Sequence, residues 1–192
     1  MSISLVIMLG LPILYLTGSL RKSTGAADIS GVCFVLYFII SALLSLFPPI
    51  MIGGDIGIIL PGAFMCLAPV VYLIIRREFN FRFYLAAMVT VLVSVTASFV
   101  SISYTISFIS ALLIFSVSFV SLIFLKSRAP LFAPVLIGIY SVSADIMSLL
   151  TEAVRTVYAF DVLDIASISF VVCLAASYFL SRPWHKTPAV QT

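Results

Sequence analysis

Apolar segments of similar length recur along the whole chain, and short polar segments separate them. An α-helix needs about 20 apolar residues to cross a hydrocarbon core roughly 30 Å thick. The apolar segments come close to that length, and they are continuously apolar, whereas a transmembrane barrel strand would alternate polar and apolar residues. The pattern therefore predicts seven transmembrane helices, at residues 2–20, 31–47, 56–75, 83–100, 106–125, 131–150 and 161–180.

The basic residues lie mainly in every second connection. Nine of the ten Lys and Arg residues fall there or after the last helix: Arg21, Lys22, Arg76, Arg77, Arg82, Lys126, Arg128, Arg182 and Lys186. The other connections hold only Arg155. Because Lys and Arg accumulate in cytoplasmic loops, this predicts an N-terminus outside and a C-terminus in the cytoplasm. We expect one all-α, multi-pass domain in the cell membrane, residues 1–180, followed by a short cytoplasmic tail, residues 181–192.

The composition agrees with a membrane protein and excludes a soluble globular domain. Hydrophobic residues make up 63% of the chain and charged residues 9%, and the mean hydropathy is +1.30. Soluble domains are about half apolar and a quarter charged. The lipid bilayer is therefore the expected partner, and the modest net charge of +3 gives no sign of nucleic-acid binding. The spacing of the three cysteines and the single histidine predicts no metal site, and no motif predicts a cofactor.

Acidic residues gather near the predicted outer face. Asp145 lies about 15 residues past Pro130, or ~22 Å along a helix, which places a carboxyl group inside the membrane. Asp161 and Asp164 open the last predicted span and share a helix face one turn apart, and Asp55 lies in an outer turn. Since ionisable groups inside a bilayer are costly, we expect these residues to form one outward-opening acidic pocket. Two structural alternatives stay open: Asp161 or Asp164 caps the last helix, and Asp145 is a neutral group bonded to a neighbouring Ser or Tyr.

The predicted third span is irregular in sequence. Gly53 and Gly54 precede it, and Pro61 and Pro69 lie within it. Because proline removes a backbone hydrogen bond and tends to kink a helix, the pattern indicates either a kinked helix beside a cavity or ordinary kinks in a packed bundle. The many serines and threonines of the fourth and fifth spans are typical of close helix packing in membranes.

Three short motifs suggest a family. They are the outer Gly53-Gly54 followed by a span with Pro61, the stretch Ala144-Asp145-Ile146-Met147-Ser148-Leu149, and Phe160-Asp161 at the start of the last span. In these motifs the chain resembles a prokaryotic membrane-protein family known as domain of unknown function 1614. The resemblance implies a multi-spanning membrane fold and no particular activity.

The sequence leaves three functions open. The acidic residues can bind a proton or small cation and couple it to solute transport. Alternatively, Asp145 and Asp161 resemble the two membrane aspartates of presenilin-type proteases, which would make the chain an intramembrane hydrolase. The third possibility is an accessory membrane protein that binds a partner through its outer surface. The substrate and the oligomeric state are not determined by the sequence.

Overall fold

A computed structural model of the chain describes residues 3–27, 29–52, 56–100, 106–150, 157–159 and 161–181. This part of the chain is helical apart from three short strands and the connections, so the predicted all-α class is confirmed for the body of the molecule. The helices are α1 (Ile3–Leu16), α2 (Arg21–Ala26), α3 (Gly31–Leu44), α4 (Leu60–Arg76), α5 (Phe81–Val100), α6 (Ile106–Leu125), the 3-10 helix η1 (Lys126–Arg128), α7 (Ala129–Leu150) and α8 (Leu163–Ser181). The strands are β1 (Ile50–Ile52), β2 (Ile56–Ile58) and β3 (Val157–Ala159).

Two helical segments in the described residues are both long enough and apolar enough to cross a membrane. They are Ala129–Met147 in α7 and Leu163–Leu180 in α8. Five further apolar helical segments are shorter, at 10–17 residues: Ile3–Leu16, Gly31–Leu44, Leu60–Arg76, Phe81–Ala97 and Leu112–Leu125. The seven-span arrangement therefore stays a prediction.

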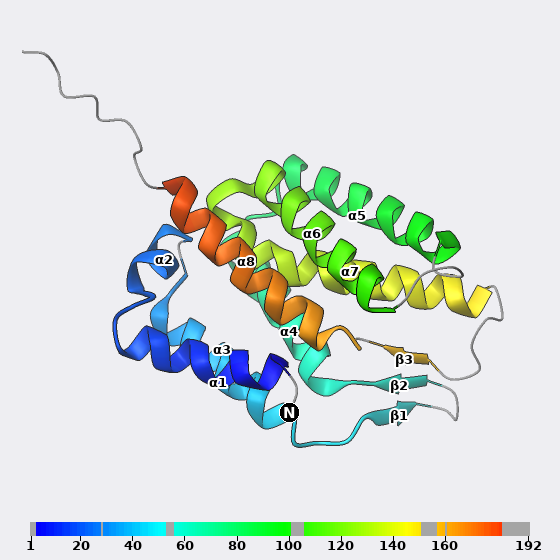
Figure 1. The fold of residues 1–192 in the computed structure, drawn as a ribbon, viewed down its shortest axis with the longest axis horizontal. Helices are drawn as coiled ribbons and strands as arrows, with labels where there is room; N and C mark the ends of the chain where they lie inside the picture. Colours follow the sequence, from blue (N-terminus) through cyan, green and yellow to red (C-terminus); the bar gives the residue numbers. More distant parts are fainter. Residues whose placement is uncertain are drawn as a thin grey trace, which may run out of the picture.

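Helices α7 and α8 form the centre of the bundle (Figure 1). Helix α7 contacts α4, α5, α6 and α8, and α8 contacts α1, α2, α4 and α6 as well. One hydrophobic core lies between α4, α5, α6 and α7, and a second joins α1 and α3 to α4 and α8. The two helices that qualify as membrane spans are thus also those with the most neighbours.

The bundle buries small hydroxyl side chains and exposes large apolar ones. Buried hydroxyls occur on α1, α2, α3, α5, α6, α7 and α8: Ser4, Ser23, Thr24, Ser41, Thr90, Ser94, Ser118, Ser121, Ser141, Ser167, Ser169 and Ser177. Some join helices directly, as where Ser94 Oγ on α5 donates to the Tyr140 carbonyl on α7 at 3.2 Å. In contrast, Phe115 and Phe119 on α6 are 72% and 54% exposed. Small residues between helices allow close approach, which agrees with the packing role expected for these residues.

A cluster of aromatic rings joins four helices around α3. Phe34 and Phe38 on α3 are almost completely buried and contact each other with ring centroids 5.1 Å apart. The Phe170 ring of α8 meets Phe38 edge-on at 5.2 Å. Tyr15 of α1 contacts Phe34 at 5.4 Å, and Tyr37 contacts Phe64 of α4 at 5.9 Å. These offset and edge-to-face arrangements are the favourable ones for aromatic pairs.

The predicted third helix, residues 56–75, is wrong at its start. Residues Ile56–Ile58 form β2, and the helix begins at Leu60. Pro61 lies in the first turn of α4. The N–H groups of a first turn make no hydrogen bond within the helix, so proline is tolerated there, and Pro61 begins the helix without kinking it. A short apolar run of β-branched residues is compatible with strand or helix, and here two neighbouring strands supply backbone partners.

The three strands form a small sheet at one end of the bundle (Figure 1). Strand β1 pairs antiparallel with β2, with Met51 opposite Gly57, and β2 pairs parallel with β3, with Gly57 opposite Tyr158. The sequence predicted a simple turn at residues 48–55 and a loop at 151–160. The sheet instead connects the segment before α4 to the segment before α8.

The first predicted span, residues 2–20, is also too long. Helix α1 ends at Leu16, Gly18 adopts a φ of +89°, and a separate short helix α2 follows. A positive φ is accessible to glycine at little cost, so Gly18 permits the change of direction between α1 and α2.

Candidate functional site

Asp145 lies on α7 near the end of the bundle that carries the sheet. Its side chain is half-buried, and one oxygen, Oδ2, accepts a hydrogen bond of 3.4 Å from Ser141 Oγ. Ser141 precedes Asp145 by one helical turn, so the two side chains share a face of α7. The structure therefore contains the bond to a neighbouring serine that the structural alternative for Asp145 describes.

Asp161 lies close to Asp145 but differs from it in environment. It is exposed and precedes α8, which begins two residues later at Leu163. The two carboxyl groups are near enough to interact electrostatically, yet no hydrogen bond joins them. Two carboxyl groups that share one proton must be in direct contact. Asp145 and Asp161 interact electrostatically but are not in such contact.

Asp164 points towards a different helix. It lies in the first turn of α8, and its Oδ1 accepts a hydrogen bond of 3.0 Å from the backbone N–H of Ser4 at the start of α1. The first four N–H groups of a helix have no intrahelical acceptor, so Asp164 stabilises the start of α1 from a neighbouring helix. The expected shared helix face of Asp161 and Asp164 is wrong, because Asp161 lies outside the helix.

The remaining predicted site residues divide into two groups. Gly53, Gly54 and Asp55 lie outside the described residues. Pro61 lines a cavity of about 280 Å³ at the sheet end of the bundle, enclosed by the starts of α1, α4 and α8 together with residues 45–49. The cavity lies beside the first turn of α4, where Pro61 begins the helix without kinking it, and its lining is mainly apolar and holds no carboxyl group.

Pro69 leaves one backbone carbonyl in the middle of α4 without its helical hydrogen-bond donor. Proline has no N–H, so the carbonyl of Met65, four residues earlier, lacks its usual helical donor. Tyr37 of α3 supplies the missing bond, with its hydroxyl 2.6 Å from the Met65 oxygen. The sequence indicates the unpaired carbonyl, but it does not identify Tyr37 as its partner, because the two residues belong to different helices.

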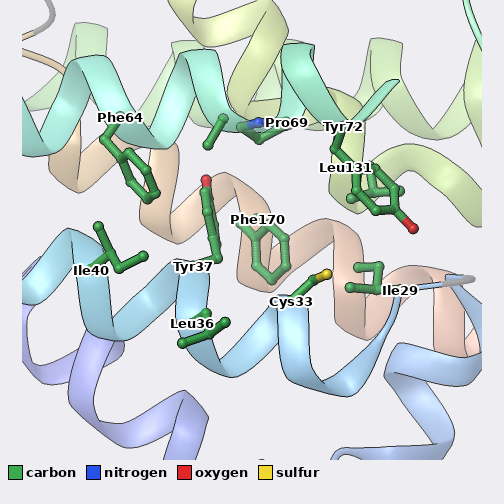
Figure 2. A pocket seen from close by; sticks show the side chains of 11 residues that line it. Ile29, Cys33, Leu36, Tyr37, Ile40, Phe64, Pro69, Tyr72, Leu131 and Phe170 are labelled. Atoms are coloured by element: carbon green, nitrogen blue, oxygen red, sulfur yellow. The ribbon is translucent and has the colours of Figure 1, made fainter. Parts of the chain in front are cut away.

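Tyr37 also crosses an apolar pocket of about 250 Å³ between α3 and α4. Figure 2 shows its ring extending from α3 towards α4, with Phe170 of α8 beside it. The other walls are aliphatic, aromatic or sulfur-bearing: Ile29, Cys33, Leu36, Ile40, Phe64, Ala68, Pro69, Tyr72 and Leu131. Its lining carries no charged group, so the pocket suits an apolar chain or ring.

The basic connections meet at the end of the bundle opposite the sheet. Helix α4 ends in a Schellman motif, in which Arg77 takes a left-handed conformation (φ 52°) and the N–H of Glu78 donates to the Leu73 carbonyl at 3.1 Å. This turn directs Glu78 to Arg128 of η1, with 2.6 Å between Oε2 and Nη1. The ion pair joins the α4–α5 and α6–α7 connections, which the charge pattern had placed on one side of the membrane.

No set of three His, Cys, Asp or Glu side chains comes together as a metal site anywhere in the described ranges. Comparisons with protein-family models, with curated proteins and with solved structures found no match. The resemblance to domain of unknown function 1614 therefore stays a prediction, and the function has to be argued from the chain itself.

Proposed function

We propose that this chain is a seven-span integral membrane protein that binds a proton or small cation at Asp145 and Asp161, as a coupled transporter does. The spans would be α1 and α3 to α8, with the sheet end outside and the basic end in the cytoplasm. The distribution of side chains supports the membrane location. Large apolar residues on all seven helices are exposed, whereas soluble proteins rarely expose continuous apolar surface.

The observation that carries the functional proposal is the half-buried carboxyl group of Asp145, the one charged residue in the sequence of α7. A carboxyl group at membrane depth is stable when it binds a proton, a cation or a hydrogen-bond donor. Ser141 donates one bond, and the electrostatic interaction between Asp145 and Asp161 favours the approach of a positive charge. These two features support the proposal that the pair binds a proton or cation.

The orientation has a direct test with single cysteines. In a variant without the exposed Cys33, a cysteine in place of Met51 on β1 should react with a membrane-impermeant maleimide added outside intact cells, because β1 is exposed. A cysteine in place of Lys22 on α2 should react only after the cells are permeabilised. The opposite labelling pattern would show that the orientation is inverted, and labelling of both in intact cells would contradict the bundle of seven spans.

Ion binding is tested by flux into vesicles. Purified protein in lipid vesicles that contain a pH-sensitive dye should carry protons or Na⁺ down an imposed gradient, detected as a change of the dye or as ²²Na⁺ uptake. Asp145→Asn keeps the shape of the side chain but removes its charge, so we expect its flux to fall to the level of protein-free vesicles. Ser143→Ala is the matched control, because within the described residues the Ser143 hydroxyl bonds to the carbonyls of Ile139 and Tyr140, one turn earlier on the same helix.

The outcomes separate this proposal from its alternatives. Wild-type vesicles that carry no flux, or an Asp145→Asn variant with full flux, would reject ion transport and favour an accessory binding role. Cleavage of a membrane-embedded peptide that depends on both Asp145 and Asp161 would instead favour the intramembrane hydrolase, which requires the two carboxyl groups to move into contact.

A further inference from the structure

A polar cavity of about 230 Å³ lies at the basic end of the bundle. The α4–α5 connection contributes Glu78 and Asn80, the first turn of α5 contributes Arg82, and η1 contributes Lys126 and Arg128. Its apolar walls are Phe124, Leu125 and Phe132. The cavity lies where α5 and α7 begin, whereas Asp145 lies in the last two turns of α7, so the two sites are at opposite ends of that helix.

The positive charge in this cavity exceeds the negative charge. Glu78 is paired with Arg128, and its side chain is only 12% exposed, so this ion pair fixes one wall. Arg82 and Lys126 are exposed, and within the described residues no carboxylate lies within ion-pair distance of either. Two cationic side chains, one at the start of α5 and one in η1, therefore face the same space, and no carboxylate in the described part of the chain pairs with either.

The backbone adds to the positive potential. Helices α5 and α7 both begin at this cavity, at Phe81 and Ala129, and the N-terminal end of a helix carries a partial positive charge. Lys126 adopts a left-handed conformation with φ 51°, which is unfavourable for a residue with a side chain. Lys126 directly follows the last residue of α6, a position where helices commonly end in a left-handed residue.

We propose that this cavity binds a phosphate group. A phosphate presents several oxygens and more negative charge than a carboxylate, so it can accept hydrogen bonds from Arg82 and Lys126 at once. The flanking phenylalanines can contact the apolar part of a phosphate-bearing molecule. The phosphate can belong to an anionic lipid headgroup or to a free phosphate compound, since basic pockets at the ends of membrane helices recognise both through the same charges.

The proposal predicts selective binding by the purified protein in a neutral detergent. Two probes distinguish the sources: inorganic phosphate, and a short-chain phosphatidic acid, with a short-chain phosphatidylcholine as the lipid of zero net charge. The double variant Arg82→Gln/Lys126→Gln should weaken binding of the recognised probe by roughly 10- to 30-fold, because it removes two close charges. The matched control is Arg21→Gln/Lys22→Gln, which makes the same change of net charge on α2, outside the cavity.

The wild-type protein supplies a second measurement that does not depend on how a variant folds. The bound probe should protect Lys126 from an amine-acylating reagent, measured by mass spectrometry, and should leave Lys22 reactive. Protection by phosphatidic acid alone identifies a lipid headgroup site, and protection by inorganic phosphate identifies a site for free phosphate compounds. Equal protection of Lys22 and Lys126, equal weakening in both double variants, or no binding of either probe would overturn the proposal.

Discussion

Replacing Phe38 with alanine should lower the free energy of unfolding by about 3 kcal/mol. Phe38 is completely buried, and its ring contacts Phe34, Tyr37 and Phe170. In lipid, apolar residues gain little from burial as such, so the cost comes from the cavity and the lost contacts. A void of roughly 100 Å³ costs about 2.4 kcal/mol at ~24 cal/mol per Å³, and the lost ring contacts bring the total to about 3 kcal/mol, the lower end of the range for Phe→Ala in a packed core.

The measurement is reversible unfolding in mixed micelles, with sodium dodecyl sulfate as the denaturant and helix content as the signal. Phe81→Ala is the matched control, since Phe81 at the start of α5 is 75% exposed and should lose less than about 0.5 kcal/mol. If Phe38→Ala and Phe81→Ala destabilise the protein equally, the aromatic cluster around α3 does not hold α3 against α8.

The second large effect concerns the carbonyl group that Pro69 leaves without a helical donor. Tyr37→Phe removes the hydroxyl that bonds to the Met65 oxygen and keeps the aromatic ring. Because the Met65 residue is completely buried, its carbonyl cannot turn to water, and we expect a loss of about 1–2 kcal/mol in the same unfolding measurement. Tyr84→Phe, on an exposed position of α5, should leave stability unchanged.

A double-mutant cycle isolates the cause of that loss. In a Pro69→Ala background, the N–H of the alanine can donate to the Met65 carbonyl as in a regular α-helix. Tyr37→Phe should then cost less than about 0.5 kcal/mol, because the carbonyl keeps one donor. An equal loss in both backgrounds would mean that the Tyr37 hydroxyl stabilises the protein in another way.

The sequence located part of the candidate acidic site. Asp145 was expected inside the membrane towards its outer side, with Asp161 in the same acidic site, and in the structure the two carboxyl groups interact electrostatically. The partner of Asp164 was not foreseen, because Ser4 is 160 residues away in sequence. Helical periodicity relates residues three or four apart, so it carries no information about which side chains of other helices lie opposite.

The cavity lined by Arg82 and Lys126 was also predictable from the sequence only in part. The charge pattern assigned the α4–α5 and α6–α7 connections to the same side of the membrane, and the structure brings them into contact through Glu78 and Arg128. Hydropathy gave no sign of a cavity there. Its shape depends on how α4 ends and on the left-handed conformation of Lys126, neither of which follows from the composition of the loops.

The sequence by itself determined that this chain is mainly helical and where its apolar segments lie, because the length and hydropathy of an apolar run are properties of neighbouring residues in the chain. It also determined the separation of basic and acidic ends, since charges are excluded from the apolar runs. Only the tertiary structure decided the pairs between distant elements: Tyr37 with Met65, Asp164 with Ser4, and Glu78 with Arg128. It also decided that Ile56–Ile58 is a strand, because a strand forms where neighbouring strands satisfy its backbone groups.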